Sequence, residues 1–199
     1  MNAPLDLVVL FADADAERFV CRLIERGVER GCLRPFAWKA IREPMRDAKV
    51  VRAPTAALGP HIANLTARFV VVWDHHGSGY EQDEPGAVEE RVLKLLEQAG
   101  IDRSRALAIA LVPELEVVLV PVWPRVLGEL AKLRDQNAPT LPIDPSDPKA
   151  SLGEALRRCR LRASPPLFGD LAGALSLREL KQGDALGRLS TALVAWFGN

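Results

Sequence analysis

An apolar run that ends in a polar turn constrains the fold of this chain more than any other feature of its sequence. Residues 69–79 read FVVVWDHHGSG, and the first five are apolar, with β-branched and aromatic side chains. Such a run is typical of a strand buried on both faces, as in a parallel sheet covered by helices. In open α/β sheets, ligands bind at the carboxyl ends of the strands. Asp74 therefore begins either a functional site or a polar turn without chemistry.

Other segments supply the partners that a buried strand needs. Apolar runs at residues 5–11 and 107–112 predict core strands, and an alternating pattern predicts a strand at residues 36–40. A short strand is also expected at residues 49–51. Apolar residues at helical spacing predict the following helices: 16–28, 54–65, 85–99, 113–120, 124–133 and 186–197. The order of strands and helices predicts an α/β fold, with a mainly parallel sheet flanked by helices and a helical C-terminal extension.

The length of 199 residues favours a single domain. Residues 135–150 are rich in proline and aspartate, which is typical of a surface connection. We therefore expect an α/β core at residues 1–135. Residues 136–199 are expected to form a proline-rich connection and a helical C-terminal extension of the same domain.

Charge and cysteine content exclude several classes of protein. Lys+Arg and Asp+Glu number 26 each, so no overall field draws the chain to nucleic acid or to anionic membrane. The three cysteines lack metal-ligand spacing and indicate a reduced, cytoplasmic location. The N-terminus lacks the pattern of a signal peptide, and no apolar stretch approaches the length of a membrane span.

Acidic residues follow all three predicted core strands. Asp13 and Asp15 follow the first, and Glu114 and Glu116 follow the third. Acids at neighbouring strand ends can bind Mg²⁺, which prefers oxygen ligands, and such an ion can activate water against a phosphodiester. Asp13 or Asp15 can instead cap the helix that follows, which is the commoner role of an acid at that position.

Histidines and glycines follow Asp74 directly. His75 and His76 can ligate a metal, transfer protons near neutral pH, or bond to carbonyls at the strand end. Adjacent residues of extended chain point to opposite faces, so at most one of them should enter a site. The turn at residues 77–79 is either a cradle of backbone N–H groups for a phosphate or simply a flexible turn.

Further along the chain, a basic cluster at residues 157–162 is read as a solvated helix face or as a contact for nucleic acid phosphates.

Three stretches together resemble a known fold family. They are LFADADAERFVCRLIERG, VVVWDHHGSG and AIALVPELE, and the last two carry Asp74 and the Glu114–Glu116 pair. They are similar to the Toprim-like fold, in particular to the small Toprim-like (DUF4276-type) proteins of bacterial antiphage loci. WDHHGSG with its acidic loop most resembles the small Toprim-like component of methylation-associated defence systems. The resemblance implies antiviral defence, with other proteins of the same defence system and DNA as partners.

The resemblance also implies a catalytic site, and this chain departs from the family pattern at two positions. Active Toprim enzymes carry a glutamate after the first strand and an Asp-x-Asp pair after a later one. Here Ala12, beside Asp13, stands in the place of the glutamate, and His76 stands in the place of the second aspartate. Histidine favours Zn²⁺ or Mn²⁺ over Mg²⁺. The expected catalytic residues are Asp74, Glu114 and Glu116, and the same three with His76 and Asp13 are the expected ligands of a divalent Mg²⁺, Mn²⁺ or Zn²⁺ ion.

Two functions remain open from the sequence. One is metal-dependent hydrolysis of nucleic acid phosphodiesters at a degenerate Toprim-like site. The other is a catalytically inactive docking or regulatory subunit of a multi-protein defence complex. Both depend on the loops that begin at Asp74 and at Glu114 opening side by side on one rim of the sheet.

Overall fold

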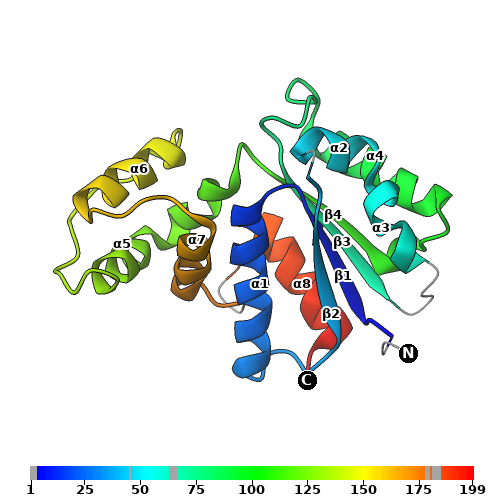
Figure 1. Ribbon diagram of the computed structural model, residues 1–199, viewed down its shortest axis with the longest axis horizontal. Coiled ribbons are helices and arrows are strands. Elements are labelled where there is room, and N and C mark those ends of the chain that lie inside the picture. Colours follow the sequence, from blue (N-terminus) through cyan, green and yellow to red (C-terminus); the bar gives the residue numbers. More distant parts are fainter. Residues whose placement is uncertain (1–3, 45, 63–66, 178–179, 181–184) are drawn as a thin grey trace.

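The computed structural model describes the chain except for residues 1–3, 45, 63–66, 178–179 and 181–184. Among the described residues, the centre is a four-stranded sheet in the order β2-β1-β3-β4, and every neighbouring pair is parallel (Figure 1). The strands are β1 (Leu7–Phe11), β2 (Trp38–Arg42), β3 (Arg68–Asp74) and β4 (Ala106–Leu111). The predicted α/β class is therefore confirmed.

Helices surround this sheet and connect its strands. The described α-helices are α1 (Ala14–Glu29), α2 (Arg46–Arg52), α3 (Pro54–Ile62), α4 (Pro85–Gln98), α5 (Trp123–Lys132), α6 (Pro148–Arg158), α7 (Pro165–Leu171) and α8 (Ala185–Phe197). Short 3-10 segments are η1 (Arg103–Arg105), η2 (Leu115–Val122) and η3 (Ala172–Ala174).

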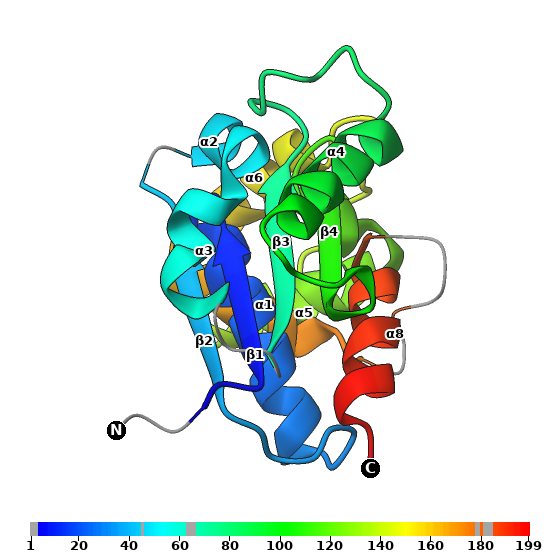
Figure 2. The same ribbon diagram turned by 90° about the vertical axis from the view of Figure 1, so that its right-hand side faces the viewer.

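The two faces of the sheet belong to two apolar clusters, because successive strand residues point to opposite sides. Val70 and Val72 of β3 face the cluster formed with α1, α5, α6, α7 and α8. Val71 and Trp73 face the cluster formed with α2, α3 and α4. Figures 1 and 2 show α2, α3 and α4 together on one side of the sheet, with α1 and α8 on the other. Burial on both faces explains why β3 is apolar from Phe69 to Trp73.

The C-terminal helices belong to the same apolar cluster as α1. Leu152 of α6, Phe168 of α7 and Leu193 of α8 are all buried in it. α7 lies directly against α1, and a Cβ atom on Gly169 would come within 3.8 Å of the carbonyl oxygen of Arg18. The helical extension thus contributes to the core on one face of the sheet.

Several local signals in the sequence act as predicted. Asp13 caps α1, since its Oδ1 accepts hydrogen bonds from the backbone N–H groups of Asp15 (2.7 Å) and Ala16 (2.9 Å). Gly31 and Gly100 follow α1 and α4 with positive φ angles of 67° and 88°. Glycine adopts this left-handed conformation without strain, so it suits the residue that ends a helix.

One predicted element differs from the structure, and another extends beyond the described residues. The predicted strand at residues 49–51 is wrong: Lys49, Val50 and Val51 lie in α2, where both valines are buried in the cluster beneath that helix. A run of three residues is too short for its periodicity to separate a strand from a helix. The helix predicted at residues 54–65 is present as α3, and residues 63–65 lie outside the described residues.

No helix in the described part of the chain is both long enough and apolar enough to cross a membrane.

Candidate functional site

Parallel pairing brings the ends of β1, β3 and β4 to one edge of the sheet. Beyond the strands, the backbone N–H of His75 donates to the carbonyl oxygen of Leu111 (2.8 Å), and that of His76 donates to Pro113 (3.0 Å). These two bonds hold the loop after β3 beside the loop after β4. Asp74 and Glu114 consequently lie on the same rim, as the sequence-based hypothesis requires.

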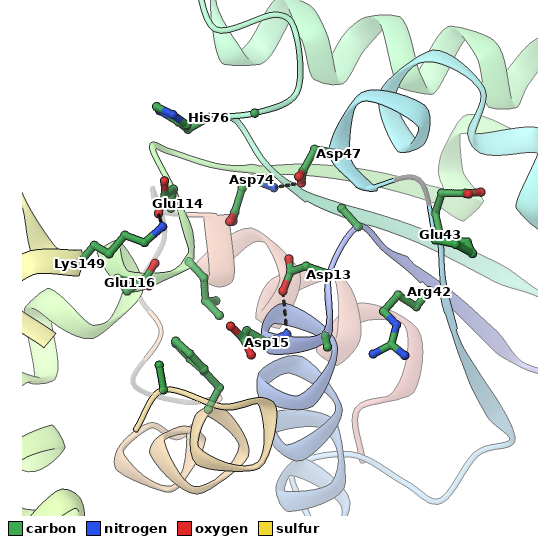
Figure 3. A pocket seen from close by; sticks show the side chains of 17 residues that line it. Asp13, Asp15, Arg42, Glu43, Asp47, Asp74, His76, Glu114, Glu116 and Lys149 are labelled. Atoms are coloured by element: carbon green, nitrogen blue, oxygen red, sulfur yellow. Dashed lines mark hydrogen bonds and ion pairs between the residues drawn. The ribbon is translucent and has the colours of Figure 1, made fainter. Parts of the chain in front are cut away.

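A pocket of about 630 Å³ opens at this rim. Its charged and polar lining consists of Asp13, Asp15, Arg42, Glu43, Asp47, Asp74, His76, Glu114, Glu116 and Lys149. Figure 3 shows the carboxylates of Asp13, Asp15, Asp74 and Glu116 around a shared space. All five residues predicted from the sequence as ligands or catalytic groups therefore line one pocket.

Asp74 is the most perturbed acid in the pocket. Burial, followed by the negative charges of Asp13, Asp47, Glu116 and Glu114, raises its pKa from the ordinary 3.8 to about 8. Its own backbone N–H donates to Asp47 Oδ1 (3.0 Å), but its side-chain Oδ1 is buried without a hydrogen-bond partner. A cation in the pocket would relieve both the repulsion and the missing contact.

Asp13 serves the fold and the pocket with different oxygen atoms. Its Oδ1 caps α1, whereas its Oδ2 is buried without a hydrogen-bond partner. The two interpretations drawn from the sequence, helix cap and metal ligand, are therefore compatible. The neighbouring Asp15 is half-buried, and burial together with the charge of Asp13 raises its pKa.

Glu114 and Glu116 both reach the pocket from the start of η2, although they are only two residues apart. Glu114 precedes the helical turn and has an extended backbone, with φ −147° and ψ 175°. Glu114 Oε2 forms an ion pair with Lys149 Nζ at the N-terminus of α6 (Figure 3). Burial is the main cause that raises the pKa of Glu116.

The two histidines point to different environments, as expected for adjacent residues at a strand end. His76 is exposed and lines the rim of the pocket. His75 is buried and does not line it, and its Nδ1 has no hydrogen-bond partner. Only His76 is therefore in a position to contact a ligand in this pocket.

The glycine turn after the histidines is filled by a carboxylate of the chain itself. Glu81 Oε1 accepts hydrogen bonds from the N–H groups of Gly77 (2.8 Å) and Gly79 (3.1 Å), and both glycines have positive φ angles. The turn thus binds an anion through its backbone, and the anion in this structure is Glu81.

The donor set suits a hard divalent cation. The buried, unpartnered Asp13 Oδ2 and Asp74 Oδ1 are carboxylate oxygens, which Mg²⁺ and Mn²⁺ prefer. Within the described ranges, no group of three or more Asp, Glu, His or Cys side chains is already arranged to hold a metal ion. Side-chain rotation around Asp74 and Asp13 would therefore accompany binding.

Four charged residues of this pocket were not predicted from the sequence, and one of them is Arg42 at the end of β2. Asp47 lies on α2, in a segment of ambiguous periodicity, and Glu43 lies just beyond β2. Lys149 comes from the C-terminal extension, 35 residues after Glu114. No local pattern marks any of these residues as part of the site, because only tertiary packing brings them to this rim.

Comparisons with protein-family models, with curated proteins and with solved structures found no match to this chain. The pocket and the sequence motifs that line it are therefore the features that indicate a function.

Proposed function

We propose that this chain is a Toprim-like bacterial antiphage defence protein that hydrolyses nucleic acid phosphodiesters with a divalent metal ion in the acidic pocket. The observation that supports this most directly is the environment of Asp74. Burial, followed by four neighbouring carboxylates, raises its pKa to about 8, and one of its oxygen atoms has no hydrogen-bond partner. Strongly perturbed acids in a pocket are frequent at functional sites.

Asp74 and Asp13 are the residues that would hold the ion, with Glu116 at the opposite wall. Mg²⁺ or Mn²⁺ bound there would supply a Lewis acid for a phosphoryl oxygen and would lower the pKa of a bound water. A cation that neutralises the neighbouring carboxylates would lower the raised pKa of Asp74 and favour the ionised form that binds a metal.

Other side chains of the pocket contribute to phosphate binding and to proton transfer. The Lys149 ammonium lies at the mouth beside Glu114, where it can contact a phosphate oxygen of the substrate. The raised pKa of Glu116 brings this carboxyl closer to the neutral range in which acids and bases transfer protons well.

The role in defence rests on the motifs of the sequence. VVVWDHHGSG and AIALVPELE supply Asp74 and Glu114, and both of these lie in the pocket. The partners would accordingly be DNA and other proteins of the same defence system.

A nuclease assay tests this proposal. The purified chain is incubated with single-stranded and double-stranded DNA and with RNA, in separate reactions with Mg²⁺, Mn²⁺ and Zn²⁺. We expect cleavage with at least one metal, and loss of at least 100-fold in rate for Asp74→Ala, since such a change removes a central group of the site. Glu97→Ala is the matched control, because Glu97 is an exposed acid at the end of α4. Equal rates for Asp74→Ala and the wild type, or no cleavage with any metal, would contradict the proposal.

One observation favours a second candidate function, an inactive docking subunit of the defence complex. The ion pair between Lys149 and Glu114 already places a cation of the chain itself among the acids of the pocket. In that case the chain co-purifies with the products of neighbouring genes, and Asp74→Ala leaves this association unchanged. Cleavage by a chain that binds none of those products would exclude docking as its role.

A further inference from the structure

A second charged region follows helix α1 away from the acidic pocket. Arg18, Arg22, Arg26 and Arg30 recur at every fourth residue. Residues four apart lie on the same side of a helix, and each step rises about 6 Å along the axis. Arg18, Arg22 and Arg26 therefore lie along one side of α1, and Arg30, which directly follows the last helical residue, extends the row to about 18 Å.

This row forms one wall of an open groove. Two adjoining hollows of about 490 and 670 Å³ share Glu129 and Gly173. The first is lined by Arg18, Arg22 and Arg26, and the second by Arg30. Figure 1 shows α7 between α1 and α5. The groove between α1 and α5 is lined by residues of α7, of η3 and of the two positions that follow η3. The opposite wall, on α5, carries Arg125 and Lys132.

Most of the positive charge in the row is not neutralised by the chain itself. Arg22 forms ion pairs with Glu25 (3.2 Å) and Glu29 (2.7 Å). In the part of the chain that the structure describes, Arg18, Arg26 and Arg30 form no ion pair.

Acids are present in the groove as well. Glu25, Glu129 and Asp170 line the first hollow beside its three arginines, so the excess of positive charge lies in the second hollow, where Arg30, Arg125 and Lys132 meet Glu129 alone. Glu129, on α5, is paired with Lys132 (2.9 Å). The pKa of Arg26 is lowered by burial and then by the charges of Arg30 and Arg22, against a smaller opposite effect of Glu29 and Glu129, so these three arginines are close enough to repel one another. An anion in the groove would reduce this repulsion.

The position of the row relative to the acidic pocket suggests its role. Asp15, in the first turn of α1, lines the acidic pocket, and Arg18 lies three residues further along the same helix. A polyanion that approaches the pocket meets an excess of carboxylates, which repel it. Binding of such a substrate therefore requires cations next to the pocket, and the groove along α1 supplies them.

We propose that this groove binds the sugar–phosphate backbone of the nucleic acid that enters the acidic pocket. The choice of partner rests on the proposed function. A row of guanidinium groups suits a polyanion, because every nucleotide of a nucleic acid strand carries a phosphate and arginine binds phosphate through two N–H groups.

Binding is measured by fluorescence anisotropy with a labelled 20-nucleotide single strand and with the matching duplex, in EDTA so that no cleavage occurs. The test variant carries Arg18→Gln, Arg26→Gln and Arg30→Gln. The matched control carries Arg157→Gln, Arg158→Gln and Arg162→Gln, three exposed arginines in and after α6.

We expect the wild type and the control to bind alike, and the affinity of the test variant to fall at least tenfold at 100 mM salt. Loss of three phosphate contacts also reduces the slope of log K against log salt by about 2–3. Unchanged melting temperatures establish that both variants fold.

Three results would overturn the inference. The first is no binding of nucleic acid by the wild type at 50 mM salt, and the second is an equal loss of affinity in the test variant and the control. The third is binding of polyglutamate as tight as that of nucleic acid, which would indicate an acidic protein partner. The acidic pocket is tested separately. If the wild type binds DNA but does not cleave it, only the nuclease proposal is contradicted. If the test variant binds DNA more weakly but still cleaves it at saturating DNA concentration, the groove contributes to binding and not to catalysis.

Discussion

The acidic pocket and the arginine groove are both clusters of like charge, yet they differ in burial. In the pocket, the side chain of Asp74 is largely buried among four other carboxylates, and its pKa rises to about 8. In the groove, Arg18 and Arg30 are exposed. Water screens charges at the surface, whereas buried charges interact strongly and lose their hydration. Repulsion is thus expected to destabilise the fold at the pocket and to have little effect at the groove.

A third region shows what a buried charge requires when it serves the fold. The carboxylate of Glu89 on α4 is nearly buried, and it accepts a hydrogen bond from the backbone N–H of Ala110 (2.8 Å) on the edge strand β4. Arg188 of α8 contacts both of its oxygen atoms at 2.6 Å. Glu89 is fully paired, whereas Asp13 and Asp74 each keep an unpartnered oxygen. Among the described residues, the two buried carboxylate oxygens that lack a partner both belong to acids of the pocket.

The largest effect is expected from Asp74→Asn. The unfolded chain ionises Asp74 near pH 3.8, whereas the folded protein keeps this proton until about pH 8. Between these values the folded state binds more protons, so the free energy of unfolding falls as pH rises from about 4 to 8. Asparagine does not ionise, so the variant does not lose this part of the free energy of unfolding as pH rises. We expect stabilisation by about 2–4 kcal/mol at pH 8, or about 5–10 °C in Tm, and little change at pH 4.

Thermal unfolding of both proteins across that pH range measures the effect. Asp135→Asn, at an exposed aspartate, is the control and should show no such dependence on pH. A lower Tm for Asp74→Asn than for the wild type at pH 8 would show that Asp74 is ionised and stabilised in the folded protein, which would remove the contrast with the groove.

A smaller effect is expected when a cation fills the pocket. A ligand that binds only the folded state at ten times its Kd stabilises it by about 1.4 kcal/mol. We therefore expect Mg²⁺ or Mn²⁺ to raise Tm by about 3–6 °C for a domain of this size, and EDTA to reverse the change. In Asp74→Asn this shift should largely vanish, while Glu97→Gln should retain it. A shift that is equal in both variants would place the ion elsewhere.

The smallest effect is expected at the groove. The triple change of Arg18, Arg26 and Arg30 to glutamine removes two exposed charges and one half-buried charge, none of which has an ion pair among the described residues. Surface substitutions of this kind alter stability by about 0.5 kcal/mol or less. Tm should stay within about 2 °C of the wild type, even though the affinity for nucleic acid falls. A large loss of stability would show that the arginines support the packing of α1 on α7.

Local patterns in the sequence predicted much of the fold and part of the site. The apolar run at residues 69–73, the cap at Asp13 and the glycine at position 100 depend on neighbours a few residues away, and each acts as expected. The prediction of a strand at residues 49–51 was wrong, because a few residues carry too little periodicity to distinguish a helix from a strand.

The sequence alone determined that buried parallel strands would carry acids at their carboxyl ends. The alternation of side-chain direction along a strand and the burial of apolar runs are local properties. Only the tertiary structure decided which charges meet there. Asp47 and Lys149 enter the pocket from α2 and α6, and the pKa of Asp74 depends on acids from several segments. Electrostatic energy depends on distance in space and on burial, and neither can be read from separation along the chain.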